Sequence, residues 1–352
     1  MMEKLRVGII GAGGIARHAH IRAFKAQKDA EVVALCDVKK ERLKQVAEEH
    51  QIPKTFTDWQ DLLKEDLDAV TICLPNYLHS EVAVAAFEAG KNVLCEKPLA
   101  INAAEGKKMV EAAKRAGKKL MVGFHRRFGQ ESQILEGFID RGELGDIYYI
   151  KASNLRRRGI PGAGGWFTTK KLSGGGVLID IGVHNLDLAL YFLGHPKPIF
   201  ALGFTYRNFS HLKRIPTRFG DMDEKGIIDV EDMALGLVRF ETGASLYLEV
   251  SWAAHLGGGG ARDFRIYGTR AGASLSPLAI HTIQNEELLD ITPVVRGKVD
   301  AYVQEMRHFL DSIKEDKEPG PSGEDGLLAT QIVDAIYESA ERGEAVQVSK
   351  QK

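Results

Sequence analysis

The sequence is poor in cysteine, in long apolar runs and in any excess of charge of one sign. Its three cysteines, Cys36, Cys73 and Cys95, lie inside apolar segments, and their spacing fits neither a disulfide framework nor a zinc motif. No run approaches the roughly 18 consecutive apolar residues of a membrane-spanning helix. We therefore expect a cytoplasmic protein with reduced cysteines. Because 47 Lys and Arg offset 48 Asp and Glu, no net field favours binding to nucleic acid or an anionic membrane.

The length and composition indicate a two-domain globular protein. The chain has 352 residues, of which 44% are hydrophobic and 27% are charged. A chain of this length predicts two domains. Such a composition excludes collagen-like, disordered and disulfide-scaffold proteins.

Short apolar segments alternate with charged helical segments in the first third of the chain. Strands are expected at LRVGII, EVVALCD, AVTICL and NVLCEK, and helices between or after them near residues 16–28, 41–49, 80–89 and 103–116. This alternation is typical of a doubly wound parallel sheet with crossover helices, whose strands are covered on both faces. The pattern stops after KLMVGF, which places the first domain at residues 1–123.

The remaining residues, 124–352, predict an α/β domain with a large, mostly antiparallel open sheet. Its strands are longer and alternate in polarity, as in IYYIKASNL, MALGLVRF and ASLYLEVSW. Two helices are expected near the C-terminus, at residues 302–314 and 326–341. Few helices remain to cover the sheet, so one of its faces is expected to be bare or to pair with another copy.

The segment LRVGIIGAGGIARHAHI predicts a strand, a glycine turn and a helix, as in dinucleotide-binding proteins. Gly11, Gly13 and Ala16 occupy the G-x-G-x-x-G/A frame. Gly11 permits the tight turn, and Gly13 lets the backbone approach a pyrophosphate at the helix N-terminus. A ligand-free glycine turn is the alternative interpretation. The residues expected to bind the cofactor here are Gly11, Ala12, Gly13, Gly14 and Ile15.

Asp37, at the end of the next strand, is the candidate for selecting the cofactor. Its carboxylate can accept hydrogen bonds from the hydroxyls of an adenosine ribose and would repel a 2′-phosphate, which favours NAD over NADP. Lys39, Lys40 and Arg42 follow closely and weaken this preference, and Arg42 is itself a candidate cofactor contact.

Further motifs occur in a characteristic order: TICLPNYLH, VLCEKPLA, GFHRRF and SGGGVLIDIGVHNLDL. Together with the glycine turn they make the chain similar to the Gfo/Idh/MocA oxidoreductases, the group of glucose-fructose oxidoreductase and inositol dehydrogenase, over nearly its whole length. The resemblance implies an N-terminal Rossmann domain, a C-terminal α/β domain, and nicotinamide bound in the cleft between them. It also implies cofactor contacts from Leu74, Pro75, Asn76, His79, Glu96 and Lys97, and a second catalytic segment containing Asp180 and His184.

Asp180, His184, Asp187 and Tyr191 are spaced to form one polar stripe on an otherwise apolar helix. Burying a carboxylate without a partner is costly, so the stripe is expected to face a cleft. His184, oriented by Asp180, could then take a proton from an alcohol near neutral pH. A structural Asp-His pair and a metal site are the alternatives, although no His/Cys cluster supports a metal.

Lys97 stands at the end of a strand and before Pro98, where its ammonium could hold a substrate oxygen. Arg127, Arg158 and Trp166 are the other candidates for substrate binding, although most charge runs form solvated surfaces. The segment RRRGIPGAGGWF resembles family members that act on inositols or on sugar derivatives such as anhydrosugars.

These observations predict an NAD(P)-dependent dehydrogenase that oxidises a secondary hydroxyl of a cyclic polyol or sugar. A homodimer or homotetramer formed through the open sheet is expected. Two alternatives stay open: an NAD-dependent glycosidase that works by transient oxidation and elimination, and a non-catalytic regulator that senses the dinucleotide.

Overall fold

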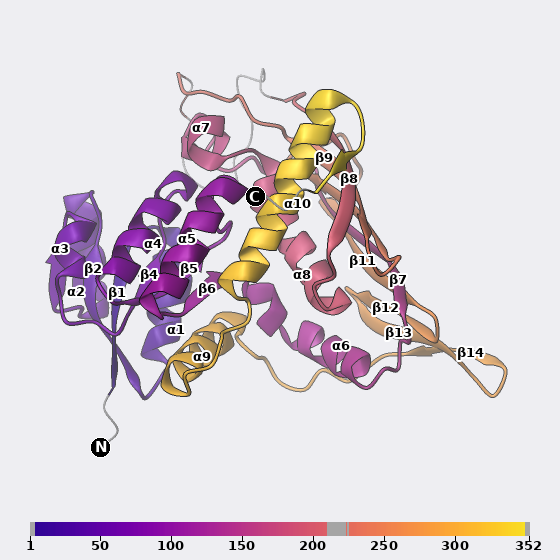
Figure 1. The fold of residues 1–352 in the computed structure, drawn as a ribbon, viewed down its shortest axis with the longest axis horizontal. Coiled ribbons are helices and arrows are strands. Elements are labelled where there is room, and N and C mark those ends of the chain that lie inside the picture. The colour runs from indigo at the N-terminus through magenta and orange to yellow at the C-terminus, as the bar shows by residue number, and fades with distance from the viewer. Residues whose placement is uncertain (1–3, 210–222, 224, 349–352) are drawn as a thin grey trace. The chain divides into compact units, whose positions relative to one another are not determined.

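The computed structural model describes residues 4–209, 223 and 225–348, and the chain divides into two compact units (Figure 1). The first unit comprises Met1–Phe128 and Asp300–Leu327. The second comprises Gly129–Val299 and Leu328–Lys352.

A six-stranded parallel sheet forms the centre of the first unit, in the order β3-β2-β1-β4-β5-β6. This is the strand order of a doubly wound Rossmann fold, which confirms the predicted fold class. The strands are β1 (Leu5–Ile10), β2 (Ala30–Cys36), β3 (Lys54–Phe56), β4 (Ala69–Ile72), β5 (Asn92–Glu96) and β6 (Leu120–Gly123). The helices are α1 (Ile21–Lys25), α2 (Lys40–His50), α3 (Trp59–Leu63), α4 (His79–Glu88) and α5 (Ala103–Ala116).

A late segment of the chain, Asp300–Leu327, belongs to the first unit, whereas the sequence analysis assigned residues 124–352 to the second domain. Helix α9 (Ala301–Lys314) buries Met306, Phe309 and Leu310 in the same apolar core as Phe24 of α1. Helix α10 (Gly323–Arg342) begins in the first unit and ends in the second. The apolar face of α9 completes the Rossmann core, which the order of the elements along the chain does not reveal.

The second unit contains a nine-stranded sheet in the order β14-β13-β12-β11-β7-β10-β9-β8-β15. Its neighbouring strands are antiparallel except for β7 and β10, which are parallel. The strands are β7 (Ile147–Arg156), β8 (Pro198–Tyr206), β9 (Met233–Phe240), β10 (Ser245–Ser251), β11 (Gly260–Gly268), β12 (Ala271–Leu275), β13 (Leu278–Gln284), β14 (Glu287–Ile291) and β15 (Val346–Gln347). The helices are α6 (Gln130–Asp140), α7 (Lys170–Ser173) and α8 (Val183–Leu193).

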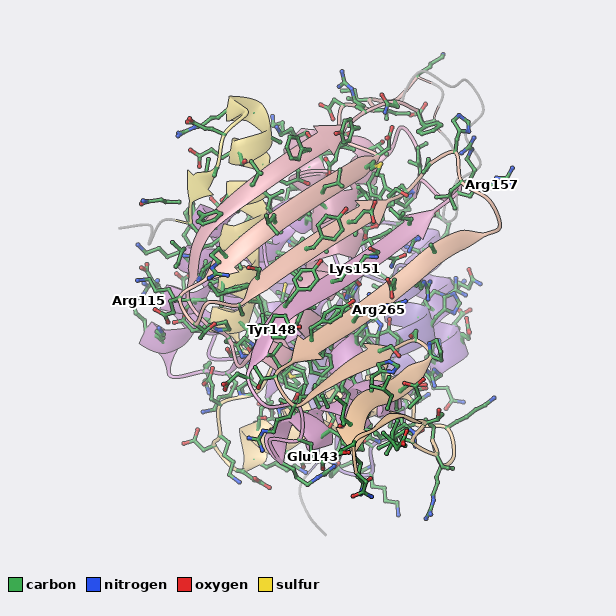
Figure 2. The ribbon with its side chains drawn as sticks, turned by 90° about the vertical axis from the view of Figure 1, so that its right-hand side faces the viewer. Arg115, Glu143, Tyr148, Lys151, Arg157 and Arg265 are labelled. Atoms are coloured by element: carbon green, nitrogen blue, oxygen red, sulfur yellow. The ribbon has the colours of Figure 1, made fainter. Side chains whose placement is uncertain are left out.

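The two faces of this sheet differ in polarity. On β7 and β10, Ile150, Leu246 and Leu248 are buried, and α8 packs against both strands. The opposite face carries polar side chains, among them Lys151 and Arg265, which Figure 2 shows on the face turned toward the viewer. Asp263 forms ion pairs with both of these residues, and Tyr149 stacks on Tyr267.

Among the described residues, one helical region, Lys170–Leu193, is long and apolar enough to cross a membrane by length and composition alone. However, 83% of its most apolar window is buried inside the protein, as in the core helix of a globular domain. The three cysteines are also buried and form no disulfide.

We predict that Phe309→Ala destabilises the first unit by about 3–5 kcal/mol, because it leaves a cavity in a core that several elements share. Urea unfolding followed by circular dichroism measures the loss. Leu288→Ala is the control, because Leu288 is 84% exposed and its truncation should change little. A loss below about 1 kcal/mol for Phe309→Ala would contradict the placement of α9 in this core.

Candidate functional site

The glycine turn after β1 leaves open space where a dinucleotide phosphate would lie. Gly11 has a φ of +100°, and a Cβ at this position would lie 2.3 Å from the carbonyl oxygen of Cys73, so only glycine fits. A Cβ at Gly13 or Gly14 would meet nothing within 4 Å. Ala16 is fully buried where the following helix packs on the sheet. These residues therefore fit a bound dinucleotide, which could approach the partly exposed Gly13 and Ile15 and the exposed Gly14, whereas Ala12 is buried.

Asp37, just after β2, is buried and holds this turn in place. Its Oδ2 accepts a hydrogen bond from the amide of Ala12 at 2.8 Å, and its Oδ1 accepts one from the amide of Lys39 at 2.8 Å. The guanidinium of Arg42 donates to both oxygens, at 2.6 and 2.7 Å. Burial would raise the pKa of Asp37, but these donors outweigh burial and lower it. Asp37 is therefore a fixed carboxylate at the end of β2.

His79 connects the two turns whose motifs predicted cofactor contacts. Its Nε2 lies 2.9 Å from the carbonyl oxygen of Leu74, and its Nδ1 lies 2.9 Å from that of Pro98. Burial lowers the pKa of this imidazole. His79 thus ties the segment after β4, which contains Leu74, Pro75 and the buried Asn76, to the segment after β5.

Glu96, at the end of β5, is bound to a histidine that the sequence analysis did not single out. Its Oε1 lies 2.7 Å from Nε2 of His20, and the other ring nitrogen of His20 lies 2.8 Å from Oγ1 of Thr71. Both His20 and Glu96 are buried. Burial opposes the imidazolium form, but Cys73 and Glu96 outweigh it and raise the pKa of His20, while His20 lowers that of Glu96 against the effect of burial.

Lys97 follows directly, and its backbone amide donates to Oε2 of Glu96 at 3.2 Å. The carboxylate of Glu96 therefore joins His20 to the backbone of Lys97. The sequence shows that His20 follows the glycine turn, but α-helical spacing does not give the direction of its side chain. The helix widens into a π-helical stretch over Ala16–His20, which shifts every later side chain around the axis.

In the second unit, Asp180 and His184 lie on one continuous helix. The stretch Leu178–Gly182 is π-helical and continues directly into α8. His184, Asp187 and Tyr191 keep α-helical spacing on α8, and only Asp180 lies in the π-helical stretch. His184 and Asp187 are buried, whereas Asp180 is partly exposed. Oδ2 of Asp180 accepts a hydrogen bond from the indole Nε1 of buried Trp252 at 2.9 Å. Trp252, just after β10, is a second residue that the sequence analysis missed.

The candidate substrate residues have contacts of their own. Arg127 is buried and pairs with Asp325 at 3.0 Å within the first unit. Arg158 donates to the carbonyl oxygens of Arg157 and Ala254 and lies over the ring of Phe209. Trp166 stacks on Phe167 with ring centroids 3.8 Å apart and is partly exposed.

Among the residues that the structure describes, no three His, Cys, Asp or Glu side chains form a group that could hold a metal ion. Of the residues predicted to be catalytic, Lys97 belongs to the first unit, and Asp180 and His184 belong to the second.

Both units match models of one family. Residues 5–124 match the model described as "Oxidoreductase family, NAD-binding Rossmann fold", and residues 137–348 match "Oxidoreductase family, C-terminal alpha/beta domain". The chain therefore belongs to the Gfo/Idh/MocA oxidoreductases, which confirms the resemblance found in its motifs. The model that matches the first unit describes it as an NAD-binding domain.

Three relatives illustrate this group. D-glucoside 3-dehydrogenase of Escherichia coli (strain K12) is 35% identical over 345 residues, covering 98% of this chain and 97% of the relative. Myo-inositol 2-dehydrogenase of Thermotoga maritima is 27% identical and covers 98% of this chain and 99% of the relative. Levoglucosan dehydrogenase in complex with NADH and levoglucosan superposes with a TM-score of 0.88 at 26% identity, over 99% of this chain and 100% of that structure.

We predict that His20→Gln destabilises the protein more at pH 6 than at pH 9. Because the pKa of His20 is raised above its ordinary 6.5, its charge stabilises the fold fully below about pH 6.5, and this contribution is lost as pH rises through the raised value. Because the pKa of Glu96 is lowered, its carboxylate stabilises the fold above the ordinary pKa of 4.5, and this stabilisation is lost as the pH falls through the lowered value. Breaking the buried pair is expected to cost about 3–5 kcal/mol at pH 6.

Urea unfolding at pH 6, 7.5 and 9 measures this dependence. His18→Gln is the matched control, because His18 lies two residues away and is exposed. An equal loss of stability at pH 6 and pH 9 for His20→Gln would contradict a loss of the charge of His20 between these two pH values.

Proposed function

We propose that this protein oxidises a secondary ring hydroxyl of a sugar, glycoside or related cyclic polyol with NAD as the oxidant. The observation that carries this proposal is the 35% identity with a D-glucoside 3-dehydrogenase over 98% of the chain. Two contacts support it, because each limits the movement of a candidate reactive residue. Glu96, next to Lys97, is held by His20, and Trp252 donates a hydrogen bond to Asp180. A D-glucoside is therefore the first substrate class to test.

Three side chains share the proposed chemistry. The ammonium of Lys97 would hold the reacting oxygen and stabilise its developing negative charge. His184 would take the hydroxyl proton as the general base, and Asp180, itself held by Trp252, would orient it. Nicotinamide, when bound, supplies the acceptor for the hydride that leaves the substrate carbon. Arg127, Arg158 and Trp166 remain proposed contacts for the rest of the substrate.

The proposed preference for NAD rests on Asp37. Its carboxylate is fixed by Ala12, Lys39 and Arg42, so it stands at the end of β2 in a defined orientation. A fixed carboxylate there can accept hydrogen bonds from ribose hydroxyls and repels a 2′-phosphate. The neighbouring guanidinium of Arg42 offsets part of that repulsion. The size of the preference for NAD over NADP must therefore be measured. The proposed contacts around the rest of the cofactor are Gly11, Ala12, Gly13, Gly14, Ile15, Leu74, Pro75, Asn76, His79, Glu96 and Lys97.

A homodimer or homotetramer through the open face of the nine-stranded sheet and a cytoplasmic location remain part of the proposal. The stacked Tyr149 and Tyr267 and the charged groups around Asp263 would lie in such an interface.

We predict that Asp37→Asn lowers the ratio of kcat/KM for NAD to that for NADP by about tenfold or more, because it removes the charge that repels the 2′-phosphate. Steady-state assays with both cofactors measure the ratio. Asp58→Asn serves as the control for the loss of a nearby acidic charge, because Asp58 is the capping residue of α3. An unchanged ratio would remove Asp37 from cofactor selection.

We predict that His184→Ala and Lys97→Ala each lower kcat on the true substrate by about 10²-fold or more, because they remove the base and the group that holds the oxygen. A panel of methyl glucosides, inositols and anhydrosugars, followed at 340 nm with NAD, supplies the substrate and the rates. Lys118→Ala, at a lysine on the loop before β6, is the control for charge loss. NAD affinity should stay within about threefold of wild type for His184→Ala.

Three results would contradict this proposal. Near-normal turnover by either variant would remove the assigned role. Release of free sugar from a glycoside without net NADH would instead support the NAD-dependent glycosidase, and NAD binding without turnover on the whole panel would support a regulator.

A further inference from the structure

The helix that carries Asp180 and His184 begins without a capping side chain of its own. Its first helical residue is Val177, and three glycines, Gly174, Gly175 and Gly176, precede it. The first amides of a helix have no partner within the helix, and a Ser, Thr, Asp or Asn side chain usually accepts their hydrogen bonds. Glycine offers no such acceptor, so the acceptors at this helix start must come from another part of the chain.

Glu231, two residues before β9, supplies these acceptors. Its Oε2 accepts from the amide of Gly176 at 2.8 Å and its Oε1 from the amide of Leu178 at 2.9 Å. Its backbone carbonyl accepts from the amide between them, that of Val177, at 3.2 Å. The Glu231 side chain is buried. One residue therefore binds three consecutive amides at the start of the helix, where a negative charge also interacts favourably with the helix dipole.

A tyrosine from α10 completes this arrangement. The hydroxyl of Tyr337 donates to Oε1 of Glu231 at 2.8 Å. The close approach of both residues also accounts for two of the glycines. A Cβ at Gly175 would lie 2.1 Å from the Tyr337 hydroxyl oxygen, and a Cβ at Gly176 would lie 2.0 Å from the carbonyl oxygen of Glu231. The glycine motif is thus shaped to receive Glu231 and Tyr337.

The neighbouring residues fix Glu231 in turn. The carboxylate of Asp232 accepts from the amides of Asn208 and Phe209, and its backbone carbonyl accepts from the amide of Trp252. Trp252 is the residue whose indole binds Asp180. The pair Glu231-Asp232 therefore contacts the start of the helix through one residue and the Trp252 backbone through the other.

We propose that Glu231, supported by Tyr337, is a positioning residue that sets the placement of Asp180 and His184 for catalysis. The inference rests on the proposed function, because it assumes that these two residues act on the substrate. Glu231 touches neither substrate nor cofactor in this account. It acts by fixing the start of the helix. Asp180 lies two residues after Leu178, whose amide Glu231 binds.

Glu231→Gln is the sharpest test, because it keeps the size of the side chain. Both carboxylate oxygens accept from backbone amides, so the Gln side chain must present its NH₂ group to one of two N–H donors. A residue that only fills space would tolerate this change. We expect kcat to fall about tenfold or more while KM for NAD stays within about twofold. Glu241→Gln, at an exposed turn, is the matched control.

Tyr337→Phe removes one hydrogen bond and keeps the backbone contacts, so it tests the proposal if Glu231→Gln folds poorly. The expected fall in kcat is smaller, about threefold, again with KM for NAD unchanged. Tyr148→Phe is the control because Tyr148 is exposed on the sheet. Wild-type kinetics for both Glu231→Gln and Tyr337→Phe would overturn the proposal.

Amide hydrogen exchange separates this inference from the proposed function. In Glu231→Gln, exchange in a peptide covering residues 174–183 should accelerate about tenfold or more, while peptides from the six-stranded sheet stay unchanged. This result does not require activity. Inactive wild type with accelerated exchange in the variant would refute the proposed function and keep Glu231 as the anchor of the helix. Unchanged exchange would refute the anchor itself, whatever the activity.

Discussion

A buried carboxylate that accepts hydrogen bonds from the backbone beside a glycine-rich segment is the interaction on which both units depend. In the first unit Asp37 binds the amide of Ala12 inside the glycine turn. In the second unit Glu231 binds the amides of Gly176 and Leu178. A buried amide left without an acceptor costs about 1–3 kcal/mol, so each carboxylate fixes a segment that glycine leaves flexible. In the second unit Gly176 allows the close approach of Glu231, and in the first unit Gly11 allows that of the Cys73 carbonyl.

In the first unit, residues near the ends of the parallel strands connect neighbouring segments through hydrogen bonds. His79 joins the segments that follow β4 and β5, and the His20-Glu96 pair joins the helix after the glycine turn to the backbone of Lys97. Ligands of open α/β sheets bind beyond the carboxyl ends of the strands, which is where these contacts gather. The candidate residues thus stand on rigid supports, as precise positioning requires.

The local pattern of the sequence predicted most strands and helices of the first unit, although the short elements β3 and α3 were not among those expected. LRVGII became β1 with the expected bounds, and the helix near residues 103–116 became α5 (Ala103–Ala116), because apolar runs and helical periods are local properties. The motifs also led to the family. The placement of α9 on the Rossmann core could not be predicted in this way, because it depends on a contact with residues such as Phe24, nearly 300 positions away.

The candidate site was predicted less completely, for physical reasons. A π-helical stretch changes the angular position of every residue after it, so α-helical spacing alone does not give the orientation of His20 or the angle between Asp180 and His184. Trp252 and Glu231 contact the helix of Asp180 from distant segments of the chain, and neither residue lies in a motif identified from the sequence. The roles of Lys97, Asp180 and His184 stay predictions. The structure shows the contacts that hold these residues, whereas their catalytic roles come from the resemblance to the family.

The most direct test of the proposed chemistry is the fate of the hydrogen on the reacting carbon. The protein would be given NAD and methyl glucosides deuterated at ring carbon 2, 3 or 4, and the nicotinamide product would be examined by mass spectrometry and NMR. The account predicts that one of these substrates gives deuterium at C4 of NADH, in a one-to-one ratio with a keto sugar. NADH without deuterium from all three substrates would contradict oxidation of a secondary ring hydroxyl.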